Sequence, residues 1–423
     1  MLKWEYELLL WRTMKNLSDF PGLLSCLPNS PTIVLHSACA QPEGLAAQLA
    51  AHAALVHGAH VVTLMPMGHA PYADPPALAH LRTTTFFPGR ALRGAARNGA
   101  VDVTRVPLSG LCALFDSGIL RADLLLLKLS PPDSEGAMTL GVSVDYMRSV
   151  LAQRPLVIAE LDTTMPETSG NTRVLEDEVD FAVEAQFAVT EMPPPEGSDI
   201  DRMIAGHIAA LVPDGAVIQS GIGAIPDLAL MRLTHLRNLG FRSGTVTDAI
   251  LPLMESGAIT GLSVATMATG TQALYRFLHR NKEFEFHPCS HTHDLALLST
   301  IPRLHAINSV LTVDLTGAAN AEQLDGISIA GPGGLPDFAH SASCAPGGRS
   351  IVALRSTSRD GRTSNIRGAI GTGGLVTVPS GHVDCIVTEY GVAHVKGLRG
   401  SARARAIAQV AHPDFRAGLS SQA

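Results

Sequence analysis

The stretch "PTIVLHSACAQPEGLAAQLAAHAALVHGAHVVTLMP" (31–66) indicates the fold of this chain. Its two ends, 31–37 and 59–66, are short apolar runs typical of buried strands, and the alanine-rich 43–58 between them is typical of a helix. Strand, helix and strand in this order form a β–α–β pattern. Runs that are apolar on both faces suit a parallel sheet covered by helices. We therefore expect an α/β fold.

The same alternation of strands and helices continues along most of the chain. The proline-rich "EMPPPEGSD" (191–199) interrupts it and is the best candidate for a linker. We expect two similar open α/β domains with mainly parallel sheets, one over residues 1–192 and one over residues 199–423. The further runs that read as buried strands are "ADLLLLKLS" (122–130), "RPLVIAEL" (154–161), "GAVIQSG" (215–221), "SIVALRS" (350–356) and "DCIVTEYG" (384–391).

Composition and charge exclude several classes of protein. A net charge of −7 gives no general attraction to nucleic acid or to an anionic membrane. The N-terminal "MLKWEYELLLWRTMK" (1–15) is unlike a signal peptide, and no apolar run is long enough to span a bilayer. The six cysteines form no C-x-x-C pair, which indicates free thiols in a reducing compartment. We expect a soluble, cytoplasmic protein without nucleic-acid or membrane partners.

Two glycine-rich loops are candidates for binding a substrate. "QSGIGAIPD" (219–227) joins a strand to a helix, where main-chain N–H groups can face an anionic or carbonyl ligand. "IAGPGGLPDF" (329–338) can present N–H donors to a thioester oxygen, as an oxyanion hole does. Both loops have an equally good steric explanation as tight connections. The candidate binding residues are Gly221, Gly223, Gly331, Gly333 and Gly334.

The segment "HPCSHTHD" (287–294) gathers three histidines and one cysteine. In a strand, alternation would put Cys289, His291 and His293 on one face, where they could serve as metal ligands or as a Cys–His catalytic pair. No second ligand cluster follows at a partner spacing, so we expect no metal site. Exposed polar loop residues are the other account of this segment.

Eight segments, taken together and in order, resemble the acetyl-CoA hydrolase/transferase family of class I CoA-transferases, which includes 4-hydroxybutyrate CoA-transferase. The resemblance implies two similar open α/β domains with an acyl-CoA site between them. The segments are "FFPGRALRGAARNG" (86–99), "SPPDSEGAMTLGVSVD" (130–145), "MPETSGNT" (165–172), "GIGAIPD" (221–227), "AINSVLTVDLTGAANAE" (306–322), "GPGGLPDF" (331–338), "VTEYGVAHVKG" (387–397) and "AHPDFR" (411–416).

The resemblance also identifies a departure from the family's chemistry. Family members transfer CoA through one glutamate, which lies in a segment that reads like H-x-E-M-x-S-D-G. Here the corresponding segment is "RSGTVTDA" (242–249), so that Gly244 stands at the glutamate position and Arg242 at that of the histidine. Leu335 stands where the family's G-x-G-G-Q loop has an amide. Since glycine can form no acyl or CoA intermediate, we expect classical CoA transfer to be lost.

Retained glycine loops predict that the chain still binds an acyl thioester, presented by CoA or by the phosphopantetheine of an acyl carrier protein. No tightly bound cofactor is expected. We expect a biosynthetic enzyme repurposed from glutamate-dependent CoA transfer to a reaction such as hydrolysis, decarboxylation or carbon–carbon bond chemistry. We also expect a homo-oligomer. The alternative is a non-catalytic acyl-thioester-binding paralogue, or a partner subunit of an active homologue.

Two thiols are candidates for replacing the glutamate. Cys289 has neighbouring imidazoles, His291 and His293, either of which could lower the pKa of the thiol and act as a base. Cys39 lies in "SACAQPEG" (37–44), in a strand-end loop of the kind that commonly faces a ligand crevice. The third account leaves both thiols inert and assigns the chemistry to main-chain donors and water.

Overall fold

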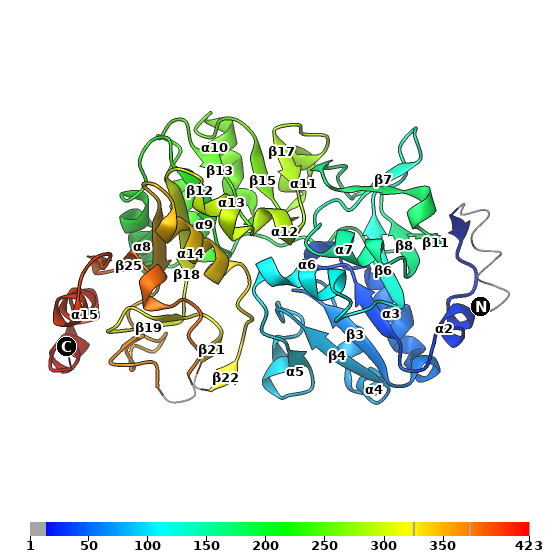
Figure 1. Cartoon of the computed structure of the whole chain (residues 1–423), viewed down its shortest axis with the longest axis horizontal. Coiled ribbons are helices and arrows are strands. Elements are labelled where there is room, and N and C mark those ends of the chain that lie inside the picture. The colour runs from blue at the N-terminus through cyan, green and yellow to red at the C-terminus, as the bar shows by residue number, and fades with distance from the viewer. Residues whose placement is uncertain (1–13, 325, 372–373, 423) are drawn as a thin grey trace. The chain divides into compact units, whose positions relative to one another are not determined.

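The computed structural model describes residues 14–324, 326–371 and 374–422, and most of the N-terminal segment 1–15 lies outside these residues. They form two compact units (Figure 1). The first unit comprises the described residues up to Arg105 together with Gly110–Met192 and Thr266–Ser290. The second unit comprises Val106–Ser109, Pro193–Ala265 and the described residues from His291 onward.

The first unit is built on an eight-stranded sheet in the order β1-β11-β8-β6-β2-β3-β4-β5. Every neighbouring pair in it is parallel. The strands are β1 (Lys15–Asn16), β2 (Thr32–Leu35), β3 (Ala59–Thr63), β4 (Leu81–Thr85), β5 (Asp102–Val103), β6 (Leu124–Leu129), β8 (Leu156–Leu161) and β11 (Phe181–Glu184).

Helices and two small strand pairs complete the first unit. Strands β7 (Ala137–Thr139) and β10 (Arg173–Leu175) are antiparallel, and β9 (Ser169–Gly170) and β17 (Phe284–Phe286) are parallel; β16 spans Met267–Ala268. The helices are α2 (Phe20–Ser25), α3 (Glu43–Ala51), α4 (Pro75–Leu78), α5 (Arg93–Arg97), α7 (Met147–Ala152) and α11 (Gln272–Leu278). Helices α6 (Leu108–Asp116) and α12 (Cys289–Thr292) contain residues of both units.

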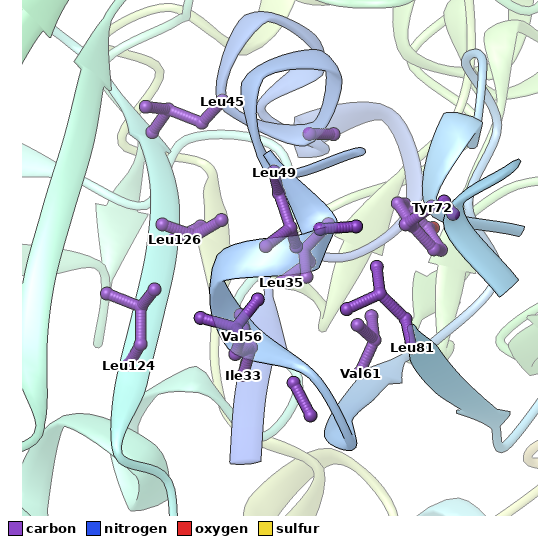
Figure 2. Packing of buried hydrophobic residues seen from close by; sticks show 14 of the residues in the cluster. Ile33, Leu35, Leu45, Leu49, Val56, Val61, Tyr72, Leu81, Leu124 and Leu126 are labelled. Atoms are coloured by element: carbon purple, nitrogen blue, oxygen red, sulfur yellow. The ribbon is translucent and has the colours of Figure 1, made fainter. Parts of the chain in front are cut away.

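The core of the first unit is mainly aliphatic, as the low aromatic content of 4% requires. Ile33 on β2 pairs with Val61 on β3 and with Leu124 on β6, so these side chains share one face of the sheet. Leu45 and Leu49, one helical turn apart on α3, pack over this face (Figure 2). Burying one such leucine contributes about 1.5–3 kcal/mol. The side chains that point to one face of the sheet, every second residue of a strand, therefore pack against side chains four residues apart on the helix.

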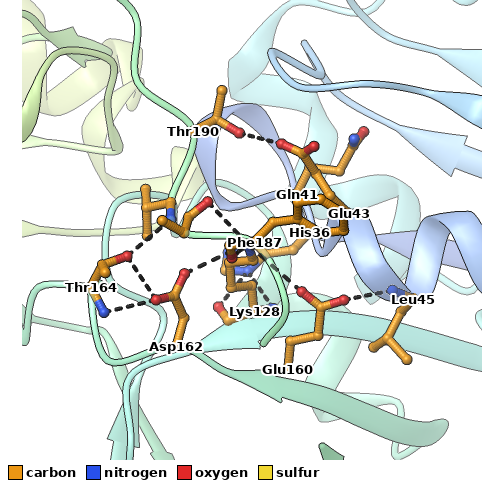
Figure 3. Close-up of polar contacts among 12 residues, drawn as sticks. His36, Gln41, Glu43, Leu45, Lys128, Glu160, Asp162, Thr164, Phe187 and Thr190 are labelled. Atoms are coloured by element: carbon orange, nitrogen blue, oxygen red, sulfur yellow. Dashed lines mark hydrogen bonds and ion pairs between the residues drawn. The ribbon is translucent and has the colours of Figure 1, made fainter. Parts of the chain in front are cut away.

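A buried lysine interrupts the apolar run of β6 (Figure 3). The Nζ atom of Lys128 donates a hydrogen bond of 2.7 Å to the carbonyl oxygen of Phe187. It also forms ion pairs with Oε2 of Glu160, at 3.7 Å, and Oδ2 of Asp162, at 3.6 Å. The other oxygen of Glu160 accepts a hydrogen bond from the Leu45 N–H. Burial raises the pKa of Glu160, and the Lys128 charge opposes that rise. This cluster joins β6 and β8 to the start of α3.

The second unit is built on a six-stranded sheet in the order β13-β12-β18-β23-β25-β26. All its neighbouring pairs are parallel except β25 and β26, which form an antiparallel pair at one edge. The strands are β12 (Val217–Ser220), β13 (Gly240–Phe241), β18 (Leu304–Ser309), β23 (Arg349–Ala353), β25 (Cys385–Thr388) and β26 (Gly391–His394).

Seven helices and several short strands surround this sheet in the described part of the second unit. The helices are α8 (Asp199–Ala209), α9 (Ala224–Met231), α10 (Leu251–Glu255), α13 (Leu295–Ser299), α14 (Leu335–Cys344), α15 (Gly400–Gln409) and α16 (Pro413–Ser420). The short strands are β14 (Thr245–Val246), β15 (Ser263–Ala265), β19 (Thr312–Asp314), β20 (Ala319–Asn320), β21 (Gln323–Leu324), β22 (Ile327–Ser328) and β24 (Ile366–Arg367).

The expected fold class, α/β with mainly parallel sheets, is confirmed. The two compact units do not correspond to a single break within the proline-rich segment 191–199. The chain crosses into the second unit at Pro193, but Thr266–Ser290 return to the first unit and Val106–Ser109 belong to the second. Each unit therefore draws on more than one segment of the sequence.

Candidate functional site

The second unit holds a glycine turn between β12 and α9. Gly223 directly precedes the helix, and its φ of +127° is one that L side chains rarely adopt. A Cβ on Gly221 would lie 2.7 Å from Oδ1 of Asn308. Asn308 is fixed by two amide hydrogen bonds with Gln219, of 3.1 and 2.8 Å. Packing and backbone geometry therefore require both glycines, and their role as donors to a ligand stays a prediction.

Gly244 lies between β13 and β14, beside the end of β12. The hydroxyl of the preceding Ser243 donates a hydrogen bond of 3.0 Å to the carbonyl oxygen of Ser220 and accepts one of 3.4 Å from its N–H. The N–H of Ser243 donates to the carbonyl oxygen of Val264 at 3.0 Å. These bonds fix Gly244, which the resemblance places at the glutamate position, close to the glycine turn that follows β12.

The second glycine-rich loop ends at the start of α14. Gly333 has a φ of +57°, and its carbonyl oxygen accepts a hydrogen bond of 3.0 Å from the N–H of Leu108. Asp337, in the first turn of the helix, accepts hydrogen bonds from the N–H and the hydroxyl of Ser109, at 3.1 and 2.7 Å. Burial raises the pKa of Asp337 to about 6, although both Ser109 bonds oppose that rise. Gly334 precedes the helix, and no side chain caps this end.

Gly244 and Gly334 both lie next to the imidazole of His293. A Cβ built on Gly244 would lie 2.9 Å from the Nε2 atom of His293, and one built on Gly334 would lie 2.4 Å from it. Both separations are shorter than real side chains tolerate. The imidazole therefore occupies the space that a side chain at either glycine would need.

His293 is enclosed by its surroundings. Its side chain is fully buried, and its ring meets that of Phe338 edge to face, with centroids 5.0 Å apart. Nδ1 lies 2.8 Å from the hydroxyl of Thr292, while buried Nε2 has no hydrogen-bond partner among the described residues. Burial lowers the pKa of His293 to about 3, so the ring is neutral at physiological pH.

A buried carboxyl group connects the first turn to the segment after Gly244. Asp227, in the first turn of α9, accepts a hydrogen bond of 2.8 Å from the hydroxyl of Thr247. Burial raises the pKa of Asp227 to about 6; the Thr247 bond opposes this rise and the charge of Asp248 adds to it. The Thr-Asp pair that matches the family segment thus lies against the helix that follows the glycine turn.

Cys39 lies in the first unit, in the 3-10 turn η1 (Ala38–Ala40). It is fully buried, and burial raises its pKa to about 12. A thiol in this environment is protonated at neutral pH, whereas a nucleophilic cysteine needs a lowered pKa. This environment favours the account in which Cys39 is inert.

The strand that would put Cys289, His291 and His293 on one face does not form, because Cys289–Thr292 form the short helix α12. Residues two apart on a helix do not share a face, so the alternation that grouped Cys289 with His291 does not apply. Cys289 is buried in the first unit, where its Sγ atom lies 3.8 Å from the hydroxyl of Thr266. His291 is exposed and belongs to the second unit. Exposed loop residues are therefore not a full account of this segment either.

Two surface hollows lie elsewhere, and the lining of neither includes His293 or the glycines of the two loops and of position 244. One, of about 490 Å³, lies in the first unit, and its lining includes His69, Asp74 and Arg90. The other, of about 510 Å³, lies in the second unit and is lined by Asp199, Arg202, Met203, Gly206, His207 and Arg232. Across the described ranges, no three His, Cys, Asp or Glu residues are placed to hold a metal ion, and no helix is both long and apolar enough to cross a bilayer.

The sequence pointed to His293 as a possible metal ligand or as a possible base for Cys289. The structure instead brings His293 together with Gly244 and Gly334, which are 49 and 41 residues away in the chain. The one available signal was the pair of glycines, because a residue without a side chain leaves room for another group. A single sequence does not say which group enters that room.

Two family models match this chain. Residues 15–192 match the acetyl-CoA hydrolase/transferase N-terminal domain, and residues 270–423 match the C-terminal domain of the same family. The segment between them, which carries Gly221 and Gly244, lies outside both matches. These matches agree with the resemblance seen in the sequence motifs.

Curated relatives and solved structures extend the comparison to nearly the whole chain. The 4-hydroxybutyrate coenzyme A transferase of Clostridium kluyveri is 34% identical over 404 residues, which cover 94% of each chain. The structure of RipA from Yersinia pestis superposes with a TM-score of 0.90 at 28% identity, covering 96% of each chain. A 4-hydroxybutyrate CoA-transferase from Porphyromonas gingivalis superposes with a TM-score of 0.81 at 26% identity, covering 96% of this chain and 97% of that one. Both units therefore have the fold of these proteins.

Proposed function

Because the chain belongs to the acetyl-CoA hydrolase/transferase family, we propose that it acts on an acyl thioester without forming the glutamyl intermediate of CoA transfer. The observation that carries this proposal is the imidazole of His293 beside Gly244, the residue that the resemblance places at the glutamate position. Glycine has no side chain and therefore offers no nucleophile at this position.

The reactions that remain are hydrolysis, decarboxylation, and the making or breaking of a carbon–carbon bond next to the thioester. Each passes through an oxyanion or an enolate, which hydrogen-bond donors stabilise. Candidate donors are the main-chain N–H groups of the glycine turns and of the uncapped start of α14. The first unit's candidate thiols are buried, and burial raises the pKa of Cys39, so the proposal uses neither.

The substrate class follows from the family, and the carrier is part of the proposal. Relatives named for 4-hydroxybutyrate, succinate, propanoate and butyrate all use coenzyme A. We propose an acyl group on CoA, or on the phosphopantetheine of a carrier protein, as substrate, with no resident cofactor, and a homo-oligomer as the working form. The thiol arm is the same in both carriers, so binding assays with CoA and with an acylated carrier distinguish the two.

The test is an acyl-transfer assay with product analysis. The protein is incubated with acetyl-, butyryl- or succinyl-CoA, each with and without acetate, propanoate or 4-hydroxybutyrate as acceptor. The proposal expects consumption of at least one thioester, independent of the acceptor, and no new acyl-CoA. A new acyl-CoA formed at an enzymatic rate would show that CoA transfer is retained.

A non-catalytic acyl-thioester-binding paralogue, or a partner subunit of an active homologue, is the second candidate. It is favoured by the shielding of Nε2 of His293 from solvent and by the packing reasons for Gly221 and Gly223. This candidate expects calorimetric binding of CoA or an acyl-CoA with no consumption of any thioester. The enzyme proposal expects binding together with turnover.

A further inference from the structure

His293 carries a polar atom that the fold of the second unit leaves unsatisfied. Its Nε2 atom is buried, has no hydrogen-bond partner among the described residues, and lies against the main chain at Gly244 and Gly334. Burying a polar nitrogen without a partner costs free energy, and a functional role is one reason for a protein to keep such a group. The place at which Nε2 points, next to Gly244 and Gly334, is therefore a candidate for contact with a ligand.

A second feature at the same place favours negative charge. Helix α14 has ten residues, begins directly after Gly334, and has no side-chain cap at this end. The first N–H groups of a helix have no partner within it, and the helix dipole gives this end a partial positive charge. The carboxyl group of its first turn, on Asp337, is engaged by Ser109. An uncapped helix start and an unpartnered ring nitrogen thus meet at Gly334.

We propose that His293 replaces the family glutamate as a hydrogen-bond donor: its Nε2–H binds the carbonyl oxygen of the acyl thioester, alongside the N-terminal end of α14. The inference rests on the proposed function, since it names a residue that holds the same substrate. The glutamate would attack the carbonyl carbon, whereas His293 polarises the carbonyl oxygen and stabilises the oxyanion or enolate that develops there.

The surroundings favour a donor over a base. The hydroxyl of Thr292, 2.8 Å from Nδ1, can donate to that atom, which leaves the ring proton on Nε2. Burial alone lowers the pKa of His293 to about 3, and the positive end of α14 adds to the preference for a neutral ring. A ring with this pKa is a weak base at neutral pH but remains a good N–H donor.

Gly244 and Gly334 leave the space that the imidazole ring of His293 fills. Gly244 and Gly334 both have backbone conformations that other residues adopt, so their glycine identity is explained by the imidazole between them. A side chain at either position would push the ring from this place.

The direct test is ¹⁵N NMR of the full-length protein labelled at histidine, because the ring-nitrogen shift distinguishes N–H from a bare nitrogen. We expect His293 as the Nε2–H form from pH 6 to 8, and a shift of that signal when acetyl-, butyryl- or succinyl-CoA is added. The His293→Gln variant assigns the signal, and exposed His235 of the same unit serves as the internal control that does not shift.

Binding of the same acyl-CoAs is measured by calorimetry, so that failure of the proposed function can be told apart from failure of the role proposed for His293. Binding of an acyl-CoA with an unchanged His293 signal, or a bare Nε2, overturns this inference and leaves the proposed function intact. Absence of binding by every acyl-CoA and by an acylated carrier overturns both. Where a thioester is turned over, we expect His293→Gln to lower kcat about 10²–10³-fold. The control variant His235→Gln should keep a kcat within about twofold of the parent protein.

Discussion

At the scale of single residues, the neutral state of His293 makes stability depend on pH. Its folded pKa of about 3 lies below the unfolded value of about 6.5. As pH falls below 6.5 the unfolded chain takes up a proton that the folded chain does not, so this contribution to stability is present above pH 6.5 and lost below it. We expect a loss of about 1 kcal/mol between pH 7.5 and 5.5.

The measurement is the thermal midpoint of the parent protein and of His293→Gln across this pH range. About 1 kcal/mol corresponds to roughly 2–4 °C for a unit of this size, so the midpoint of the variant should fall less on acidification by that amount. The pKa of buried His36 is also lowered, chiefly by burial, and this residue contributes equally to both proteins. Parallel curves for parent and variant would contradict the burial of a neutral ring at position 293.

The close approach of His293 to Gly334 predicts a non-additive pair of substitutions. In the parent protein, Gly334→Ala places a methyl group 2.4 Å from Nε2, and we expect a destabilisation of about 1–3 kcal/mol from overpacking. In a His293→Ala background the same change meets no ring and should be close to neutral. Chemical denaturation of the four proteins measures the coupling. Equal costs of Gly334→Ala in both backgrounds would show that the ring is not there.

At the scale of elements, the β–α–β pattern was predictable because strand and helix each present a repeated apolar face. The runs 31–37 and 59–66 contain strands β2 and β3, and the helix expected over 43–58 is α3 followed by a 3-10 turn. The segment 287–294 was not predictable in this way. Its polar residues have no apolar period, and only tertiary packing shows that Cys289 and His293 are buried while His291 is exposed.

The ion cluster on β6 predicts a large effect of one substitution. Lys128→Met removes the cation between two buried carboxyl groups, those of Glu160 and Asp162, and we expect a loss of about 3–5 kcal/mol. The control is Lys396→Met, whose ion pair with Asp384 leaves the lysine 57% exposed and should cost less than about 1 kcal/mol. Similar denaturation midpoints for the two variants would contradict the structural role of Lys128.

At the scale of the whole molecule, the fold and the family could both be read from the sequence, because eight long segments occur in the family's order. The return of Thr266–Ser290 to the first unit could not, since no composition change marks it. The position of Gly244 came from segment matching, but the meaning of that glycine depends on His293, which enters from another part of the chain. Contacts of this kind have no signal in one sequence.

The central claim is that the chain handles acyl thioesters without a covalent CoA intermediate, and intact-protein mass spectrometry tests it most directly. The protein is incubated with acetyl-, butyryl- or succinyl-CoA, quenched at low pH and weighed, with a glutamate-containing family member as positive control. A glutamyl-CoA thioester would add the mass of CoA, less one water, to the chain. We predict an unchanged mass for this protein and an adduct for the control. A CoA adduct on this protein, localised to a carboxylate by peptide mapping, would contradict the account.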